Sequence, residues 1–264
     1  MRAVGLHADV IVVTSRVWQT TCTLVRGGDE AFVVDSPVYP DELQILPSLL
    51  EQARFDFAGL LATHADFDHL LGRLAFPDAS LGVAITSAER LRSQPGAAQR
   101  ELRDFDERHY VRRERPLALG ALQALPVPGR CGLGDRDLLL HPAPGHTADG
   151  MAIVADWAGV LVCGDYLSPI ELPTLGQDGS LAAYLQTLER LEALVQEAAH
   201  VVPGHGPVLG REQALGVLAE DRAYLVGLRE DPERVELPAG RTGAHQRRLH
   251  AANRARLAGP QAAS

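Results

Sequence analysis

HADFDH, residues 64–69, places four side chains that can bind a metal ion within six residues: His64, Asp66, Asp68 and His69. A transition-metal site needs such nitrogen and oxygen donors held together against their mutual repulsion. The hexapeptide follows residues 58–63, an apolar run with the length of a strand. We therefore expect its polar residues in a loop at a strand end, where layered α/β folds usually bind ligands.

Three further candidate ligands lie downstream beside glycines. His146 stands in the segment PGHT, Asp165 in CGDY and His205 in PGHG, and each segment follows a predicted strand. Glycine lets the backbone bend sharply next to a ligand. We expect these three residues to complete the metal centre. The other six of the ten histidines lack this glycine-flanked context and are expected outside it.

Predicted strands and helices alternate along most of the chain. Strands are predicted at residues 10–13, 21–25, 31–35, 58–63, 137–143, 151–157, 159–165 and 200–202. Helices are predicted after Pro40, in two parts of residues 87–115, at residues 180–198 and from about residue 209 onward. Gly27-Gly28-Asp29 predicts a hairpin turn, and Pro47 is expected to break or kink the first helix.

The end of the chain differs from the alternating part. From about Leu209 the pattern is helical, interrupted only by residues 231–243, which contain prolines and glycines. We expect a catalytic domain at residues 1–210 and a helical extension at residues 211–264. Residues 240–264 hold five arginines and no acidic residue. These arginines either contact an anionic part of a substrate or form a solvated helix face.

Composition narrows the function classes. The 264 residues carry a formal net charge of −9, which disfavours nucleic acid as a partner. A hydrophobic content of 46% can fill the core of a globular protein. The sequence has no lysine, which excludes Schiff-base catalysis and lysine-containing phosphate loops.

Location is predicted from the apolar runs and the first residues of the sequence. No run approaches the roughly 20 residues that span a bilayer, and the first ten residues lack the pattern of a secretory signal. We expect a cytoplasmic protein that does not bind membranes. Cys22, Cys131 and Cys163 show no paired spacing and are expected to be buried free thiols.

The ordered motifs resemble those of a known family. H-x-D-x-D-H at residues 64–69, G-H-T at 145–147, G-D at 164–165 and G-H-G at 204–206 are similar to motifs of the metallo-β-lactamase superfamily. The similarity runs from about residue 10 to 210. It implies an α+β fold: a four-layer αβ/βα sandwich with helices outside two β-sheets, followed here by the C-terminal helical extension.

The resemblance also implies two divalent metal ions, with zinc the first expectation. His64 and His146 would hold one ion, Asp68, His69 and His205 the other, and Asp165 would bridge them. A water bound to such an ion has its pKa lowered toward neutrality and becomes the nucleophile, a metal-bound hydroxide. Asp68 would ligate the second ion and orient this nucleophile. Thr63, Thr147 and Asp35 are candidates to hydrogen-bond the ligating imidazoles.

Asp66 departs from the family pattern, which usually has a histidine at this position. If Asp66 ligates, its hard oxygen shifts the site toward iron or manganese. Flavodiiron members of the superfamily carry a carboxylate at the same place. If Asp66 points away, the first site is weakened, and one or both sites could be empty in a purified sample.

The function implied by the resemblance is hydrolysis of a small-molecule ester or thioester, as in glyoxalase II, whose helical C-terminal part helps to bind the thiol carrier. The substrate would be a small, and in one interpretation anionic, molecule. A lactonase on the same centre is an alternative, as are a diiron oxidoreductase and a non-catalytic member of the family. Tyr166 either donates a hydrogen bond to a developing oxyanion or only packs. The oligomeric state is not predicted.

Overall fold

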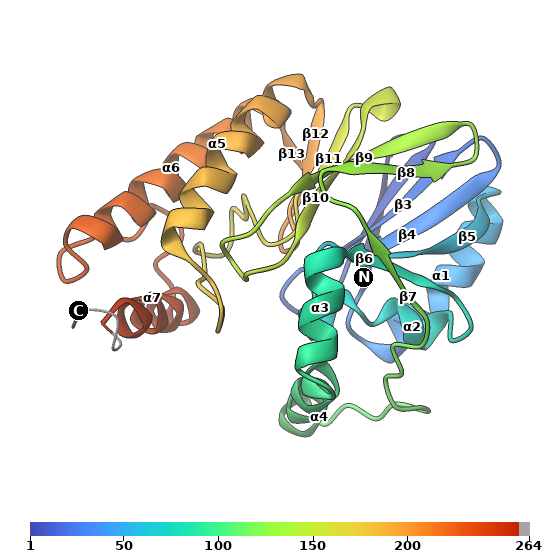
Figure 1. Cartoon of the computed structure of the whole chain (residues 1–264), viewed down its shortest axis with the longest axis horizontal. Helices are drawn as coiled ribbons and strands as arrows, with labels where there is room; N and C mark the ends of the chain where they lie inside the picture. The colour runs from blue at the N-terminus through green and yellow to red at the C-terminus, as the bar shows by residue number, and fades with distance from the viewer. Residues whose placement is uncertain (259–264) are drawn as a thin grey trace.

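Two β-sheets lie face to face at the centre of the structure (Figure 1). The computed structural model describes residues 1–258. The first sheet has seven strands in sequence order: β1 (Arg2–His7), β2 (Val10–Thr14), β3 (Thr21–Gly27), β4 (Glu30–Asp35), β5 (Asp56–Leu61), β6 (Leu81–Ala84) and β7 (Leu122–Leu125). The second has six strands in reverse order: β13 (Leu209–Gly210), β12 (His200–Val202), β11 (Val160–Val162), β10 (Met151–Ala155), β9 (Arg136–Pro142) and β8 (Gly129–Leu133).

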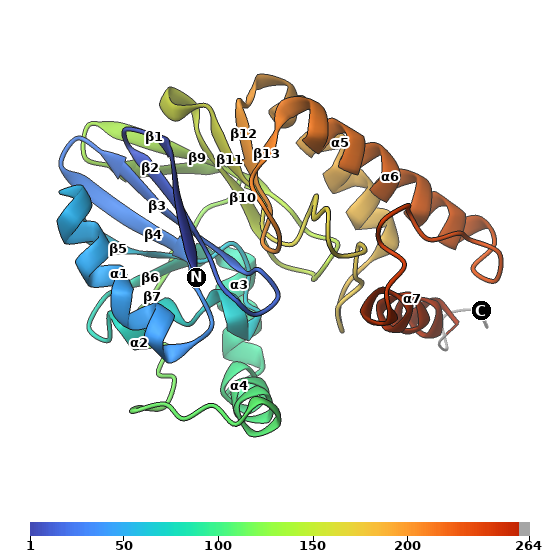
Figure 2. The ribbon, with the colours of Figure 1, turned by 180° about the vertical axis from the view of Figure 1, so that it is seen from behind.

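Helices cover the outer face of each sheet, which gives four layers (Figures 1 and 2). The helices are α1 (Pro40–Ala53), α2 (Gly72–Ala75), α3 (Ile85–Ser93), α4 (Ala97–His109), α5 (Leu181–Glu197), α6 (Arg211–Glu230) and α7 (Ala244–Leu257), of which α7 lies apart from both sheets. Leu46 of α1 joins Leu24 of β3 in one buried cluster. Leu188 of α5 joins Val201 of β12 in another. The predicted αβ/βα sandwich is confirmed.

A third buried cluster fills the space between the sheets. It combines Val12 and Val34 of the first sheet with Leu138 and Val162 of the second. Strands such as β3 are therefore buried on both faces, which explains why TCTLV is an almost continuous apolar run with little alternation.

The strand connections bring several loops to one edge of the sandwich. β1 to β4 pair antiparallel, whereas β4 to β7 pair in parallel through crossovers that contain helices. The second sheet is antiparallel except for β11 and β12, whose crossover contains α5. The loops that follow β5, β11 and β12 carry three of the motifs described above.

Some local expectations need correction. α1 runs without interruption through Pro47, because Leu43, Leu46 and Leu50 are buried on one face and offset the hydrogen bond that proline cannot make. β1 was not predicted from the sequence. It is an edge strand whose residues are mostly exposed, so it lacks the apolar signal of a buried strand.

The chain after residue 210 forms α6 and α7, joined by residues 231–243, which contain neither helix nor strand. α6 lies beside α5 on the second sheet (Figure 2). Residues 259–264 of the predicted extension lie outside the described residues. The domain boundary at residue 210 stays a prediction.

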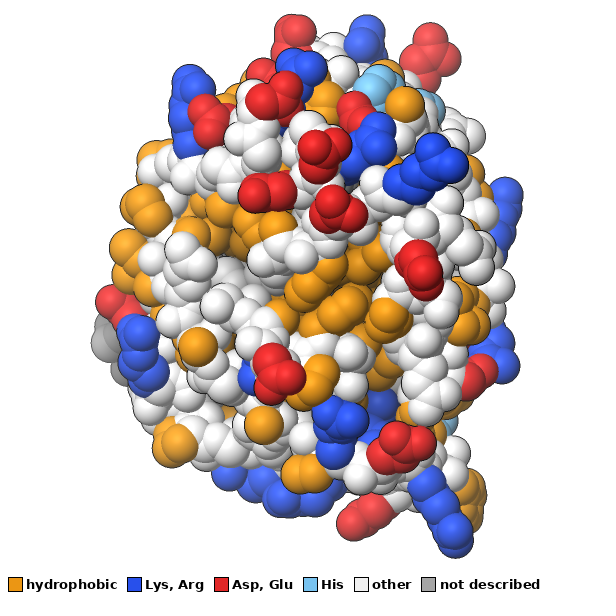
Figure 3. Space-filling view, turned by 90° about the vertical axis from the view of Figure 1, so that its right-hand side faces the viewer, with side chains coloured by type: hydrophobic (Ala, Val, Ile, Leu, Met, Phe, Trp, Pro, Cys, Tyr) orange, Lys and Arg blue, Asp and Glu red, His pale blue; other side chains and the backbone are white. Residues whose placement is uncertain are grey.

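Charged side chains of both signs lie on the surface. Figure 3 shows acidic and basic side chains interspersed around a hollow in which hydrophobic side chains gather. Within residues 1–258, no helix is both long and apolar enough to span a membrane.

Candidate metal centre

The predicted ligands come together at the edge of the sandwich where the loops after β5, β11 and β12 open. His64 follows β5, and Asp68 and His69 belong to a 3-10 helix, η1 (Phe67–His69). His146 lies in the turn between β9 and β10, Asp165 follows β11, and His205 follows β12. The side chains of His64, Asp68, His69, His146 and His205 are buried.

The first ligand group contains two imidazoles and two carboxylates. Asp66 Oδ2 lies 3.6 Å from His64 Nε2 and 3.3 Å from His146 Nε2. Asp165 Oδ2 lies 3.7 Å from His64 Nε2 and 3.4 Å from His146 Nε2. Both carboxylates therefore approach the same two imidazole nitrogens, and His64, Asp66 and His146 lie close enough together to hold one ion.

The second group has the same composition. Asp165 Oδ1 lies 3.1 Å from His69 Nε2 and 3.3 Å from His205 Nε2. Asp68 Oδ2 lies 3.8 Å from His69 Nε2 and 3.5 Å from His205 Nε2. Asp165 thus turns one oxygen toward each group, as a ligand shared between two ions would.

An oxygen atom lies beside the Nδ1 atom of each of the four imidazoles. His64 Nδ1 lies 3.1 Å from the Thr63 hydroxyl, and His69 Nδ1 lies 3.1 Å from Asp35 Oδ2. Asp35 also accepts hydrogen bonds from the Thr63 amide and hydroxyl. With oxygen at each Nδ1, the Nε2 atoms are free to face the centre. Thr63 and Asp35 thus lie where partners of the imidazoles were predicted.

The other two imidazoles use partners that the sequence did not indicate. His146 Nδ1 lies 2.9 Å from the Thr174 carbonyl oxygen, and His205 Nδ1 lies 3.2 Å from the Trp18 carbonyl oxygen. The hydroxyls of Thr174 and Thr20 also lie 2.9 Å from His146 Nδ1 and 3.3 Å from His205 Nδ1, respectively. Both threonines are far in sequence from the histidine they contact, which is why local sequence patterns did not reveal them. The hydroxyl of Thr147 donates instead to the backbone of Asp149, so Thr147 is not a partner of an imidazole.

Unpaired buried atoms test whether this donor set fits a metal. His64 Nε2, His69 Nε2 and Asp165 Oδ1 are buried and have no hydrogen-bond partner within residues 1–258. Buried polar atoms are almost always paired, and a cation between the groups would satisfy all three. A side chain at Gly204 would collide with Asp165 Oδ1, so glycine leaves room for the shared ligand. The residues present fit two divalent ions.

The carboxylates dominate the electrostatics of the centre. Burial alone would lower the pKa of His205, but the charges of Asp165, Glu171 and Asp68 raise that pKa to about 10. Burial also opposes protonation of His146, yet Asp66 and Asp165 raise the pKa of His146 to about 9. The centre therefore favours positive charge, whether protons or metal cations supply it.

An arginine compensates for the carboxylate of Asp66. Arg90 of α3 donates to Asp66 Oδ1 over 2.8 Å and to Asp149 Oδ1 over 2.9 Å. Asp149 Oδ2 in turn accepts from the Ala65 amide over 2.9 Å. Asp66 is thereby held with one oxygen on Arg90 and the other toward the metal ligands. Arg90 offsets the negative charge that this residue adds relative to a histidine.

Tyr166 lies behind the ligands. Its hydroxyl donates to the Ala143 carbonyl over 3.1 Å and accepts from the His146 amide over 3.0 Å. The residue is 3% exposed. This geometry favours a role in supporting the turn at His146 over contact with a developing oxyanion.

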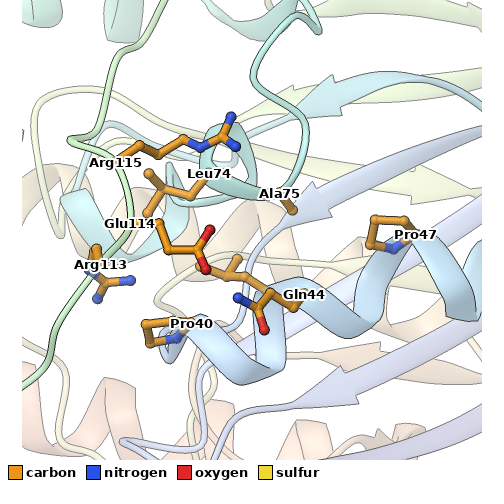
Figure 4. Close-up of a pocket in the computed structure, with 9 residues that line it drawn as sticks. Pro40, Gln44, Pro47, Leu74, Ala75, Arg113, Glu114 and Arg115 are labelled. Atoms are coloured by element: carbon orange, nitrogen blue, oxygen red, sulfur yellow. The ribbon is translucent and has the colours of Figure 1, made fainter.

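A separate hollow lies between α1, α2 and residues 113–115, with a volume of about 250 Å³ (Figure 4). Gln44 and Glu114 project into it from opposite walls. It shares no lining residue with the ligand groups. We therefore place the chemistry at the metal centre.

Replacing Asp66 with histidine should change metal preference. The variant exchanges an oxygen donor for a nitrogen donor and removes one of the carboxylates that Arg90 binds, while Asp149 remains. We expect the affinity for zinc relative to manganese to rise by about 10-fold or more. Competition titration of both metals measures this ratio. Asp156→His adds a histidine at an exposed position and should leave the ratio unchanged. An unchanged ratio and unchanged activity in Asp66→His would place Asp66 outside the ligand set.

Comparisons with known proteins agree with this geometry. Residues 15–205 match the family model described as the metallo-beta-lactamase superfamily. A metallo-beta-lactamase family protein from Thermus thermophilus superposes with a TM-score of 0.64 and 20% identity over 85% of this chain and 83% of that one. A metallo-beta-lactamase from Pontibacter korlensis superposes with a TM-score of 0.62 and 16% identity over 83% and 97%.

The metallo-beta-lactamase DIM-1 superposes with a TM-score of 0.61 and 17% identity over 83% of this chain and 94% of that one. At such identities these structural likenesses show the fold alone. No curated protein sequence matches the chain.

Proposed function

The chain belongs to the metallo-beta-lactamase superfamily, and from this premise we propose that it is a hydrolase that requires two divalent metal ions. We further propose that it cleaves an ester or thioester bond of a small molecule. The observation that carries the proposal is Asp165, which turns one oxygen to each of two groups of matching composition. Each group then offers two imidazole nitrogens and two carboxylate oxygens.

The chain's own residues have distinct tasks in this reaction. Bound at the centre, two divalent ions would lower the pKa of water and polarise the oxygen of the scissile bond. Thr63, Asp35, Thr174 and Trp18 hold the four imidazoles in their orientation. Asp68 presents its carboxylate to the second group, beside His69 and His205, and from there it would orient the attacking water.

The donor set supports a proposal for the identity of the metal. Two nitrogens and two oxygens per site suit zinc and are also acceptable to manganese and iron. Arg90 neutralises the added charge of Asp66, which keeps the first site compatible with zinc. We therefore propose zinc at both sites, with iron or manganese as the alternatives that elemental analysis of the purified protein would reveal.

A small-molecule substrate is supported by the charge and by the C-terminal helices. The net charge of −9 opposes a polyanionic partner such as nucleic acid. The connection before α7 and α7 itself contact residues 168–177, which follow Asp165, so the helical extension borders the centre. This placement suits an extension that helps to bind one part of a thioester or ester, as the likeness to glyoxalase II implies.

A substrate panel tests the proposal. Purified protein, loaded with zinc or manganese, is assayed with a glutathione thioester, an aryl carboxylic ester, an acyl-homoserine lactone, a cephalosporin and an aryl phosphodiester. We expect kcat/KM for the thioester or carboxylic ester to exceed every other value by about 10-fold or more, a difference of about 1.4 kcal/mol in transition-state binding.

Two controls accompany the panel. Removing the metals with a chelator should abolish the activity, and adding them back should restore it. A dominant lactone, cephalosporin or phosphodiester activity would overturn the proposed substrate class. Metal-loaded protein that is inactive on the whole panel would overturn the hydrolase proposal itself.

A further inference from the structure

Residues 168–177 form an irregular segment between β11 and α5 whose backbone is bound by side chains from the end of the chain. Arg241 donates to the carbonyl oxygens of Ser168 over 3.1 Å and Glu171 over 2.9 Å. Arg256 donates to the carbonyl oxygen of Gln177 over 2.6 Å. An irregular segment has no neighbouring strand to satisfy its backbone groups, so these side chains take that role.

Two amide side chains of α7 make the most specific of these contacts. Gln246 accepts from the Leu172 amide over 3.0 Å and donates to the Ile170 carbonyl over 2.6 Å. Asn253 accepts from the Leu175 amide over 3.0 Å and donates to the Pro173 carbonyl over 2.7 Å. A carboxamide can donate and accept at once, so each residue pairs with the segment as an adjacent strand would.

The segment in turn holds a metal ligand. Its residue Thr174 lies between the two backbone groups that Asn253 binds, and its carbonyl oxygen is 2.9 Å from His146 Nδ1. The Gly176 amide donates to the His146 carbonyl over 2.6 Å. A displacement of residues 173–176 would therefore move both the ring and the backbone of His146.

The composition of α7 indicates that these contacts are its main attachment. Its buried residues are Gln246 and Asn253, both polar, so the helix lacks the apolar stripe with which surface helices usually dock. Asn253 is 1% exposed and also donates to the Tyr224 hydroxyl over 3.2 Å. Burying an amide is unfavourable unless its hydrogen bonds are made, and here two of the three are made to the segment that carries Thr174.

We propose that Asn253, assisted by Gln246, is a positioning residue for the metal ligand His146. Asn253 fixes residues 173–175, these residues fix the Thr174 carbonyl, and that carbonyl sets the orientation in which His146 Nε2 faces the first metal site. The C-terminal helix is thereby part of the metal centre, although it supplies no ligand. The inference rests on the two metal sites of the proposed function but not on the substrate.

Metal titration of Asn253→Ala tests the inference. Zinc dissociation constants are measured against a chromophoric chelator, which resolves two binding events per chain. We expect one event to weaken by about 10-fold to 100-fold, the usual cost of losing an outer partner of a ligand. The other event should change by less than about twofold, because Thr174 orients His146 and not His69, Asp68 or His205.

Two ligand variants identify which site is affected. In a His146→Ala background the first site is already lost, so adding Asn253→Ala should weaken the remaining event by less than about twofold. In a His205→Ala background the second site is impaired instead, so Asn253→Ala should still weaken binding at the first site by about 10-fold to 100-fold. Equal weakening in both backgrounds, or of both events in the parent chain, would overturn the inference.

Matched variants separate positioning from general stability. Arg248→Ala changes an exposed residue of α7 and should leave both dissociation constants unchanged. Gln246→Ala removes the assisting contacts to Leu172 and Ile170 and keeps Asn253, so it should give a smaller weakening of the same event and serves if Asn253→Ala does not fold. A lower melting temperature with unchanged metal affinity in either variant would show a structural role only. Protein that binds two ions normally yet hydrolyses nothing would refute the proposed function and leave this inference intact.

Discussion

Replacement of Asp165 by asparagine is expected to lower kcat/KM by more than about 100-fold, because losing an outer partner of one ligand already costs about 10-fold to 100-fold. Asp165 faces both groups: Oδ1 lies near His69 and His205, and Oδ2 lies near His64 and His146. Asparagine has nearly the same shape but no charge, and it offers only one oxygen. Both sites should therefore bind metal more weakly at once.

Metal content gives a measurement that does not depend on the substrate. Elemental analysis should show two ions per chain in the parent protein and one or fewer in Asp165→Asn. Asp137→Asn removes a carboxylate at an exposed position and should keep both ions. Circular dichroism of the metal-free proteins checks that the fold persists. Two tightly bound ions in Asp165→Asn, with activity preserved, would contradict the assignment of Asp165 as the shared ligand.

The residues that form the two groups could be predicted from sequence because each motif has a local cause. His64, His146, Asp165 and His205 all follow a strand, and three of them stand directly after a glycine. The strands could be predicted for a similar reason, because burial of one face gives an alternating apolar pattern and burial of both faces gives a continuous one. Local patterns therefore indicated most of the buried strands and all seven candidate ligands, whereas the sandwich was implied by the resemblance to the metallo-β-lactamase superfamily.

The supporting contacts could not be predicted, because they join residues far apart in sequence. Arg90 reaches Asp149 across 59 residues, and Asn253 reaches Leu175 across 78. Neither has a motif around it. Thr174, whose carbonyl and hydroxyl oxygens both lie 2.9 Å from His146 Nδ1, is 28 residues away from that histidine. From the sequence, the C-terminal arginines were expected either to contact an anionic part of a substrate or to form a solvated helix face. The side chain of Arg241 is instead buried, with 1% exposed.

Replacement of Arg241 by methionine should lower the free energy of unfolding by about 3 to 5 kcal/mol near pH 8, the usual cost of breaking a buried ion pair from one side. Its guanidinium lies 2.5 Å from Asp221 Oδ1 and 2.9 Å from Glu220 Oε2. Asp221 is also buried, so the variant leaves a carboxylate without its counter-charge. Arg130→Met, which disrupts an exposed pair with Asp137, should cost less than about 1 kcal/mol. Chemical denaturation measures both changes.

The pH dependence of this loss separates the ion pair from mere packing. Burial raises the pKa of Asp221, Arg241 opposes the rise, and the resulting pKa is about 7. Without Arg241 the folded-state pKa should rise further, while the unfolded-state pKa stays near 4. The folded variant then retains its proton where the parent releases it, so the stability deficit should grow as pH rises through 7 and shrink toward pH 5.

A second substitution tests whether the carboxylate of Asp221 causes this pH dependence. Adding Asp221→Asn to Arg241→Met removes the titrating carboxylate, so the growth of the deficit above pH 7 should disappear. Part of the stability should return, because no buried charge is left unpaired. Recovery should be incomplete, since the carbonyl groups of Ser168 and Glu171 still lack the donor that Arg241 supplied. A deficit that is constant from pH 5 to pH 9 in Arg241→Met would show that lost packing, and not the ion pair with Asp221, accounts for the change.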